Sequence, residues 1–447
     1  MAFRDLAETL GALRALGRLV EVDGPVSPRH EIAAVLDREP GRAVLLTRVR
    51  GHGVPVAGNV IHSRRVLALT AGVEPGALAG ETARRAARPI APRAVERAPV
   101  EERDASDTPL GRVLPILTHY EGDCGPYITT ALISARDPDT GAVARGIHRM
   151  ELRGDRELGA ALLNPPLSDL YARHRERGQP MPAAVVVGVE PLTFTAFAVE
   201  APAGTDKLAV AGGLRAEPVE VVAAGLTGID VPAHAEFLLE GEVDPSDERD
   251  DGPMGEIGGY AGVFPRTPTF RVRRITHRQA PVYHALLPDG PDGDLLLALA
   301  TEIRVAAALP AGMPEVLGFH VVPRTLGSSV VIRVAEAPGA RVREILARVL
   351  DLSRVKKAVA VAEDVGPADP AGVEWSMAVR FQASRDLLVV PEGRGLPIDP
   401  SCPAPFRTSK LGIDATGYER VRGHRRATIP RAARARAETL LSREKNP

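Results

Sequence analysis

The stretch Asp251-Gly-Pro-Met-Gly-Glu256 continues as Ile-Gly-Gly-Tyr260 and follows the apolar run Phe237-Leu-Leu239. The apolar run predicts a buried strand. The Gly-Pro pair predicts a tight turn after it, because glycine permits unusual backbone angles and proline fixes one of them. Two carboxylates, Asp251 and Glu256, would then stand on a stiff turn. Such a pair suits proton transfer when its surroundings bring one pKa near neutrality, although an ordinary acidic turn has the same spacing.

The sequence around this stretch is rich in short β-strands. From about residue 113 to residue 275, apolar segments alternate with Gly/Pro turns, which is typical of a closed or split barrel. A single helix over 158–175 is expected to interrupt the strands. The predicted strands cover 127–133, 147–152, 184–189, 194–199, 219–222 and 237–239.

The two flanking regions have a different pattern, in which helices and strands alternate. Before the strand-rich region, the chain predicts a small α/β unit followed by a proline-containing surface connector over 76–108. After it, the chain predicts a second α/β layer and a C-terminal helix over 428–443. We therefore expect a mixed α/β protein of three parts, which are an N-terminal α/β domain with connector (1–108), a split β-barrel domain (109–280) and a C-terminal α/β domain with a terminal helix (281–447).

The bulk composition excludes several classes of function. The net charge of −1 offers no basic field for nucleic acid, and 4% aromatic residues offer few platforms for base stacking. The sequence contains neither an apolar run of membrane-spanning length nor a signal peptide. Cys124 and Cys402 are too few for a disulfide framework. We therefore expect a cytoplasmic protein without nucleic-acid or membrane partners.

Three further segments accompany the carboxylate pair. The segment Arg145-Gly-Ile-His-Arg-Met150 predicts a hairpin end that presents Arg149 to a carboxylate or phosphate. The loop Gly204-Thr-Asp-Lys207 offers an ammonium to an anion. The segment Thr408–Thr416 holds a lone Lys410 among small polar residues. Each segment alone is equally typical of a solvated loop.

Taken in order, these motifs resemble the UbiD family of decarboxylases, which use prenylated flavin mononucleotide. The resemblance runs nearly end to end, through Arg4–Leu10, Asp123–Thr129, Val231–Glu236, Gly252–Glu256 and Ser409–Thr416. It implies a lyase that reversibly decarboxylates an unsaturated or aromatic carboxylic acid without oxidation. It also implies a flavin-binding central domain, assembly into a homodimer or homohexamer through the C-terminal domain, and a flavin prenyltransferase that supplies the cofactor.

The resemblance assigns roles to individual residues. Arg149 would orient the substrate carboxylate or the flavin, Glu256 would return a proton to the carbon that loses carbon dioxide, and Asp251 would hold Arg149 and tune Glu256. Lys410 matches a family lysine that contacts the phosphate or the flavin. The backbone at Ile147 and His148 would also border the cofactor, and strand alternation favours opposite faces for His148 and Arg149.

The chain departs from the family at the metal. Family members hold manganese and potassium at the flavin phosphate through an asparagine, a histidine and a glutamate, and these positions hold Ala144, Leu167 and Lys207. Hydrocarbon side chains cannot coordinate hard cations, so the sequence argues against both metals. In one interpretation Lys207, assisted by Arg145, replaces the metal. In the other, the protein uses a different cofactor or acts as a noncatalytic binding subunit.

Overall fold

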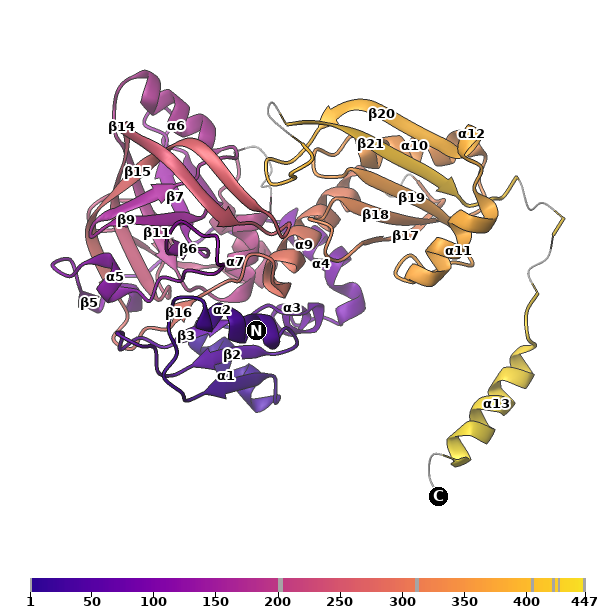
Figure 1. The fold of residues 1–447 in the computed structure, drawn as a ribbon, viewed down its shortest axis with the longest axis horizontal. Helices are drawn as coiled ribbons and strands as arrows, with labels where there is room; N and C mark the ends of the chain where they lie inside the picture. Colours follow the sequence, from indigo (N-terminus) through magenta and orange to yellow (C-terminus); the bar gives the residue numbers. More distant parts are fainter. Residues whose placement is uncertain are drawn as a thin grey trace.

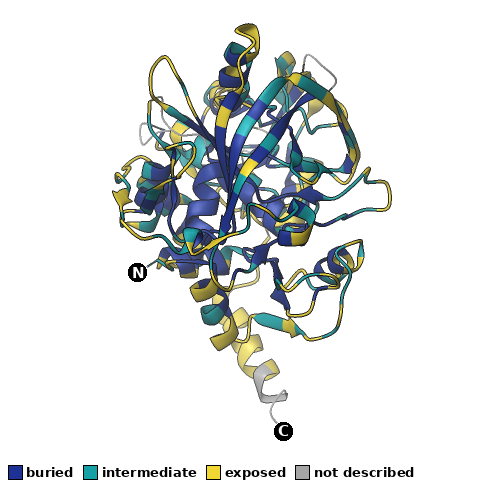
Figure 2. Cartoon of the chain, turned by 90° about the vertical axis from the view of Figure 1, so that its left-hand side faces the viewer, coloured by how far each residue is buried: buried dark blue, intermediate teal, exposed yellow. Residues whose placement is uncertain are grey.

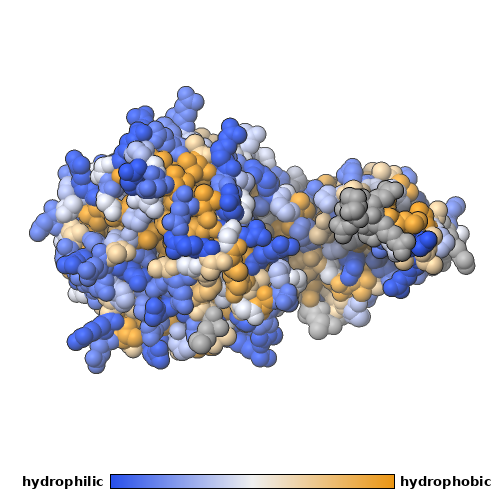
Figure 3. Space-filling view, turned by 90° about the horizontal axis from the view of Figure 1, so that it is seen from below, coloured by the Kyte–Doolittle hydropathy of each residue, from blue (hydrophilic) through white to orange (hydrophobic). Residues whose placement is uncertain are grey.

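A computed structural model describes residues 2–199, 204–309, 313–402, 406–419, 423–424 and 427–444. The chain forms a large body, which contains the N-terminal and central sheets, and a smaller C-terminal body (Figure 1). Helix α9 (Pro291–Ala308) joins the two bodies, because it packs against α4 (Leu78–Ala86) on one side and β17 (Val316–Val321) on the other. The molecule narrows between the bodies when it is seen from below (Figure 3).

The N-terminal part is the predicted small α/β unit. Its helix α1 begins after Asp5, whose side chain accepts a hydrogen bond from the backbone of Glu8 at 2.8 Å and so caps the helix. Strand β16 lies beyond residue 280 but pairs with β3, so this sheet takes a strand from far along the chain. The domain boundaries given above stay predictions. The sheet order is β1 (Leu19–Val22), β2 (Ala43–Leu46), β3 (Val56–Gly58) and β16 (Tyr283–His284), with helices α1 (Leu6–Ala15), α2 (Glu31–Arg38) and α3 (Arg64–Ala71).

The central sheet positions the carboxylate pair. Its longest strands, β14 and β15, form a hairpin whose register shifts several times, and such bulges bend a sheet. Within the described residues the pairing is an open path from β6 to β8, and the mixed α/β architecture is confirmed. The order is β6 (Tyr127–Ile128), β9 (Met150–Gly154), β10 (Glu157–Ala160), β15 (Ala261–His277), β14 (Phe237–Gly255), β11 (Met181–Val187), β7 (Leu132–Arg136) and β8 (Val143–Ile147), and β5 (Arg103–Asp104) also pairs with β15.

Two apolar cores hold this body together. One core lies on the inner face of the bent central sheet and continues into the N-terminal unit, and the other lies between the opposite face of the sheet and the helices. Figure 2 shows that buried residues concentrate inside this body. Helices α6 (Leu167–Glu176) and α7 (Pro191–Ala198) pack on the sheet, α8 (Lys207–Arg215) packs on α7, and α4 packs on α8. A small sheet of β13 (Asp230–Pro232), β12 (Glu220–Ala223) and β4 (Arg93–Ala94) and the short helices η1 (Pro75–Ala77), η2 (Pro99–Glu101) and α5 (Leu110–Val113) complete the body.

Three segments differ from their predictions. The predicted strand over 194–199 is wrong, because Glu190 caps the helix α7 through the backbone of Leu192 and Thr193, and an apolar run alone does not distinguish a strand from a helix. The predicted helix over 158–175 is wrong in its first half, where β10 pairs with β15 before Asn164-Pro-Pro166. The connector over 76–108, expected to be a surface segment with broken helix, contains α4, whose Leu78, Thr82 and Ala86 are buried.

The C-terminal body is the predicted second α/β layer. Its sheet order is β17, β18 (Ser329–Val334), β19 (Lys357–Ala362), β21 (Arg407–Ala415) and β20 (Leu387–Arg394), and its helices are α10 (Gly339–Leu350), α11 (Pro370–Arg380) and α12 (Ala383–Asp386). The expected C-terminal helix is α13 (Arg431–Glu444), which stands apart from both bodies in Figure 1. None of the helices described combines the length and the apolar character needed to span a bilayer.

Candidate active site

Arg149 lies where the central sheet opens. The residues His148 and Arg149 connect β8, at one end of the sheet path, to β9, next to its other end. Such a corner directs successive side chains to different sides. The ring of His148 donates through Nδ1 to the carbonyl of Ala161 at 2.8 Å, whereas Arg149 extends toward β14 and β15. Arg149 therefore lies in the connection between the two ends of the open sheet path.

The two predicted carboxylates meet Arg149 there. The Nε of Arg149 donates to Oδ1 of Asp251 at 2.8 Å, and its two terminal nitrogens donate to Asp251 and to Glu256. Two rings complete the environment, because Cζ of Arg149 lies 4.7 Å from the ring centre of Phe264 and 5.5 Å from that of Tyr127. The structure thus brings together all three residues of the predicted trio.

The local backbone differs from the expected turn. Asp251 stands inside β14, opposite Phe264 of β15, and the register shifts on both sides of it. The turn itself comes later, where the backbone N–H of Glu256 donates to the carbonyl of Tyr260 at 2.9 Å. Gly252 has a φ of +106°, which an L-residue rarely adopts. A Cβ at Gly255 would lie 2.2 Å from the ring of Tyr120, so only glycine fits beside Glu256.

Burial dominates the electrostatics of the trio. It raises the pKa of Glu256, and the charge of Asp251 adds to the increase while Arg149 opposes it. Burial also raises the pKa of Asp251, and the positive charge of Arg149 again opposes the increase. Burial by itself would lower the pKa of Arg149, but Glu256 and Asp251 raise it. The site therefore combines a permanent cation with two acids that are easier to protonate than in water, which suits proton delivery at the end of a reaction.

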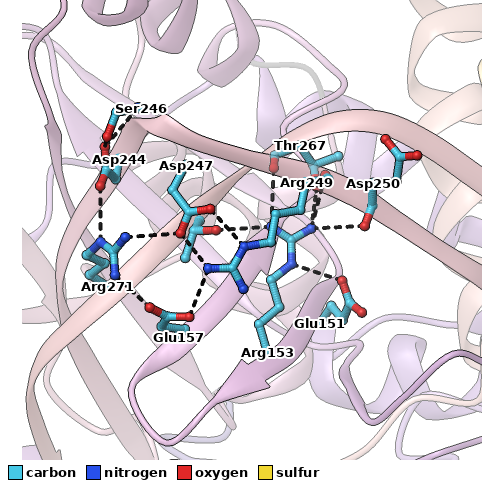
Figure 4. A network of polar contacts seen from close by, with 11 residues as sticks. Glu151, Arg153, Glu157, Asp244, Ser246, Asp247, Arg249, Asp250, Thr267 and Arg271 are labelled. Atoms are coloured by element: carbon cyan, nitrogen blue, oxygen red, sulfur yellow. Dashed lines mark hydrogen bonds and ion pairs between the residues drawn. The ribbon is translucent and has the colours of Figure 1, made fainter.

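Neighbouring side chains hold the backbone that leads to Asp251, and Figure 4 shows Arg153 among Glu151, Arg249 and Asp250. Arg153 donates through Nη2 to the carbonyls of Arg249 and Asp250, at 3.3 and 3.4 Å, immediately before Asp251. Its Nε donates to Glu151 at 3.0 Å. Sequence analysis missed Glu151 and Arg153, although the alternation of positions 149, 151 and 153 along a strand places them on one face. The rings of Tyr127 and Phe264 were also missed, and they carry no comparable signal.

Lys207 and Arg145 lie on the side of His148. Lys207 is the first residue of α8, and its ammonium donates to the carbonyl of Phe197 at 2.6 Å. Burial lowers the pKa of His148 to about 4, and the ammonium of Lys207 contributes to this, so the two groups are close and the imidazole is neutral. Arg145 is buried and bonded to Asp206 at 2.7 Å, to Ser134 and to the carbonyl of Asp230. It supports the start of α8 rather than presenting a free guanidinium.

The donor set does not fit a metal. Ala144 and Leu167 are buried in the apolar core, and within the described residues no cluster of histidine, cysteine and acidic side chains suits a metal ion. A side chain at Gly146 would meet the ring of His148, with Nε2 at 2.8 Å, and Leu167 at 3.3 Å, so this space is already filled. Ile147 packs against the second apolar core. Lys207 places a positive charge at the first turn of α8, whose N-terminus is already capped by Asp206 through the backbone N–H of Leu208 at 2.8 Å.

Lys410 does not join these groups. Its ammonium donates to the carbonyls of Leu350 and Leu352, both at 2.7 Å, at the end of α10 in the C-terminal body. Burial lowers its pKa to about 8. In this structure the ammonium of Lys410 caps a helix C-terminus, where unpaired carbonyls attract a cation, and its contact with the phosphate or the flavin stays a prediction.

Comparison with known families agrees with this arrangement. Residues 93–291 match the 3-octaprenyl-4-hydroxybenzoate carboxy-lyase Rift-related domain, residues 294–415 match the C-terminal domain of the same enzyme, and residues 10–86 match its N-terminal domain. The chain belongs to the UbiD family. Curated relatives of this UbiD protein include an anhydromevalonate phosphate decarboxylase of Methanosarcina mazei, which is 33% identical over 93% of this chain and 96% of its own.

Solved structures give the same family. The UbiD-class enzyme HmfF from Pelotomaculum thermopropionicum, in complex with FMN, superposes with a TM-score of 0.89 at 32% identity, over 95% of this chain and 97% of its own. The 3,4-dihydroxybenzoic acid decarboxylase of Klebsiella pneumoniae superposes with a TM-score of 0.88 at 26% identity, over 96% of this chain and 97% of its own. The large body and the C-terminal body thus have the fold of UbiD-class decarboxylases.

Proposed function

We propose that this UbiD protein is a nonoxidative decarboxylase of an unsaturated or aromatic carboxylic acid, with prenylated FMN as its cofactor. The observation that carries the proposal is the buried guanidinium of Arg149 shared by Asp251 and Glu256. The relatives that decarboxylate anhydromevalonate phosphate and 3,4-dihydroxybenzoic acid support the reaction class and leave the substrate open. Assembly as a homodimer or homohexamer and a flavin prenyltransferase as cofactor supplier belong to the proposal.

Arg149, Glu256 and Asp251 have different roles in the proposed reaction. Arg149 binds the substrate carboxylate and holds the bond to be broken in place. The bound cofactor supplies an electron sink for the substrate. When the carbon–carbon bond breaks, carbon dioxide leaves and the electron pair stays on the substrate carbon. Glu256 then donates its proton to that carbon, and Asp251 keeps Arg149 aligned and favours the protonated form of Glu256.

We also propose that Lys207 replaces the metal at the flavin phosphate. A divalent cation with a glutamate ligand carries the same net charge as one lysine ammonium, so Lys207 would replace the charge of that pair, although not the charge of the potassium ion. The buried hydrocarbon of Ala144 and Leu167 at the other two ligand positions supports the proposal. Arg145 acts indirectly, because it holds Asp206 at the start of α8.

The first experiment is an absorption spectrum, a cofactor mass and a metal analysis on protein co-expressed with a flavin prenyltransferase. Bound prenylated flavin without manganese supports both proposals. Folded protein without flavin contradicts them and favours a different cofactor or a noncatalytic binding subunit.

Lys207→Glu tests the lysine directly. We expect this variant to lose flavin or to require manganese for binding, because the substitution restores an acidic ligand and removes the ammonium. The matched control is Lys357→Glu at an exposed position of β19, which should keep its flavin. Unchanged metal-free flavin binding by Lys207→Glu would contradict the role of Lys207.

A further inference from the structure

One short segment spans from the strand that follows Arg149 to the strand that ends before Glu256. It is the loop 119–126, which runs into β6, and we call it the bridging loop. On one side it is bonded to β9, because β6 pairs with that strand and the backbone N–H of Leu152 donates to the carbonyl of Pro126 at 2.9 Å. On its other side it contacts the end of β14. The bridging loop therefore touches both elements whose separation decides how the proton donor meets the guanidinium.

The end of β14 needs such a neighbour. Strand β11 pairs with β14 only as far as Val243, and the pairing with β15 shifts register between Asp251 and Met254. Backbone groups without a strand partner require other hydrogen-bond partners. The bridging loop supplies one of them, because the backbone N–H of Cys124 donates to the carbonyl of Pro253 at 2.8 Å. The loop thus takes the place of a neighbouring strand at this point.

Asp123 makes the second contact with this edge. Its Oδ1 accepts the backbone N–H of Gly255 at 2.9 Å. Its Oδ2 accepts the backbone N–H groups of His119 and Tyr120, both at 2.9 Å, so the carboxylate is fixed within its own loop. A carboxylate accepts hydrogen bonds that are about twice as strong as those between neutral groups. Asp123 therefore holds Gly255, the residue directly before Glu256, against a fixed point.

The ring of Tyr120 supports Gly255 from the side. A Cβ at Gly255 would lie 2.2 Å from Cδ2 of this ring, so the ring is in direct contact with the backbone. The phenolic hydroxyl accepts the backbone N–H of Asp289 at 3.0 Å, which keeps the ring in place. Beyond Gly255, the backbone N–H of Glu256 donates to the carbonyl of Tyr260 in the hairpin turn. The backbone of Glu256 is thus fixed on both sides.

We propose that Asp123 is a positioning residue that holds Glu256 within reach of Arg149 and of the substrate carbon. The inference rests on the proposed decarboxylase function and deepens it, because it assigns a residue to the alignment of the proton donor. Proton transfer requires the donor at hydrogen-bond distance from the atom that receives the proton, and a displacement of about 1 Å can cost about 100-fold in rate. Asp123 acts on Glu256 only through the backbone of Gly255, so it transfers no proton itself.

Asp123→Asn separates the two halves of this contact. Asparagine keeps one acceptor oxygen for His119 and Tyr120 and turns its amide group toward the N–H of Gly255, which it cannot bond. We expect the amide of Gly255 to exchange with deuterium about 10- to 100-fold faster, the effect of losing one hydrogen bond to a charged group. The amide of Leu152, on the far side of the bridging loop, is the internal reference and should be unchanged. Unchanged exchange at Gly255 would overturn the inference.

The rate assay uses the flavin-loaded enzyme and a panel of unsaturated and aromatic acids that includes 3,4-dihydroxybenzoic acid. Asp123→Asn should lower kcat by about 10- to 100-fold and change KM by less than about threefold, because it alters the alignment of the donor and leaves the substrate-binding groups in place. Its flavin spectrum should match that of the wild type. A raised KM with an unchanged kcat would contradict the positioning role.

The matched control is Asp137→Asn. Asp137 also accepts two backbone N–H groups in its own turn, but this turn precedes β8 and so lies at the opposite end of that strand from Arg149. We expect Asp137→Asn to keep its kcat. An equal loss of kcat in both variants would show that the effect of Asp123→Asn is general destabilisation and would rule out the positioning role.

A compensating pair of variants keeps the test decisive if Asp123→Asn does not fold. Gly255→Ala drives a methyl group into the ring of Tyr120 and should push the end of β14 away from the bridging loop, so kcat should fall by about 10-fold or more. Tyr120→Ala in the same chain removes the ring and should restore part of kcat. A normal kcat in Gly255→Ala, or a double variant no faster than the single one, would count against the inference.

Two outcomes separate this inference from the proposed function. A wild type that decarboxylates acids of the panel, beside an Asp123→Asn variant with undiminished kcat, would overturn the positioning role alone. A wild type that binds no flavin and decarboxylates none of the panel would overturn the proposed function and the positioning role that rests on it, although faster exchange at Gly255 in Asp123→Asn would still show that Asp123 holds this backbone.

Discussion

At the scale of the residue, one buried guanidinium serves two carboxylates. Asp251 is fully buried, and within the described part of the chain its Oδ2 has no hydrogen-bond partner. Two buried negative charges beside a single positive charge would leave one of them unpaired, at a cost of several kcal/mol. One proton shared between Asp251 and Glu256 removes that cost. The free site is therefore organised to carry the proton that the product carbon needs.

Glu256→Gln tests the proton donor. Glutamine keeps the size of the side chain but has no acidic proton, so we expect kcat to fall by about 100- to 10,000-fold, the usual range for a general acid, while the flavin stays bound. The measurement is steady-state decarboxylation together with an absorption spectrum. Glu242→Gln is the matched control, because Glu242 pairs with Arg273 on a partly exposed face. Near-normal kcat in Glu256→Gln would exclude Glu256 as the donor.

The pH profile tests the coupling between the carboxylates. The proton donor must be protonated, so activity is lost as the pH rises through the raised pKa of Glu256. Asp251→Asn removes a negative charge that raises this pKa, so the pKa should fall. We expect the alkaline limb of the kcat/KM profile to move to lower pH in Asp251→Asn. An unmoved limb would show that another group limits the alkaline side.

At the scale of the element, β9 aligns the site. Arg149, just before β9, and Glu151 and Arg153 within it alternate along one face. Arg153 reaches β15 through Thr267 at 2.7 Å and Thr269 at 3.1 Å, and it reaches β14 through the carbonyls of Arg249 and Asp250. A Cβ at Gly159 would lie 2.5 Å from this guanidinium, so β10 leaves room for it. Arg153 is thus a positioning residue that ties the strand of Arg149 to the strand of Asp251.

Arg153→Met tests this positioning role. Methionine keeps the bulk of the side chain but cannot bond the carbonyls before Asp251, so Asp251 should lose its alignment with Arg149. We expect kcat to fall by about 10- to 100-fold with a smaller change in KM, and the pH profile to shift. Arg153→Lys should recover part of kcat. The control is Arg271→Met, which disrupts the neighbouring network with Glu157 and Asp244 (Figure 4). Equal losses in both variants would indicate general destabilisation instead.

The elements also show what sequence can predict. Arg149, Asp251 and Glu256 could be predicted because they belong to motifs that occur in this chain in the same order as in the UbiD family. The α/β layers were predictable because their apolar periodicity is local. The position of Asp251 inside a strand could not be predicted from sequence. Bulges in β14 accommodate the Gly-Pro pair, and these bulges depend on pairing with residues of β15 that are distant in sequence. The burial of Lys410 was missed for the same reason, because α10 supplies its partners.

At the scale of the whole molecule, a polar bridge fastens the N-terminal part to the central sheet. Arg278, just after β15, lies 3.2 Å both from Asp5, which caps α1, and from Glu236, just before β14. The backbone N–H of Val282 also donates to Glu236 at 2.9 Å. Burial raises the pKa of Glu236 from 4.5 to about 7, although Arg278 opposes the increase. The bridge is therefore sensitive to pH in the neutral range.

Glu236→Gln tests the contribution of this bridge to stability. Because the folded pKa of Glu236 is raised, its contribution to stability is fully present below the unfolded pKa and is lost as the pH rises through about 7. The loss is on the order of 3 kcal/mol. Glutamine keeps an acceptor for Val282 and does not titrate, so between about pH 5 and pH 8 the free energy of unfolding of the wild type should fall relative to that of the variant. Denaturant unfolding at several pH values measures the difference, and the exposed Glu392→Gln serves as control. Parallel pH curves for wild type and Glu236→Gln would mean that the carboxylate of Glu236 does not control the stability of this junction.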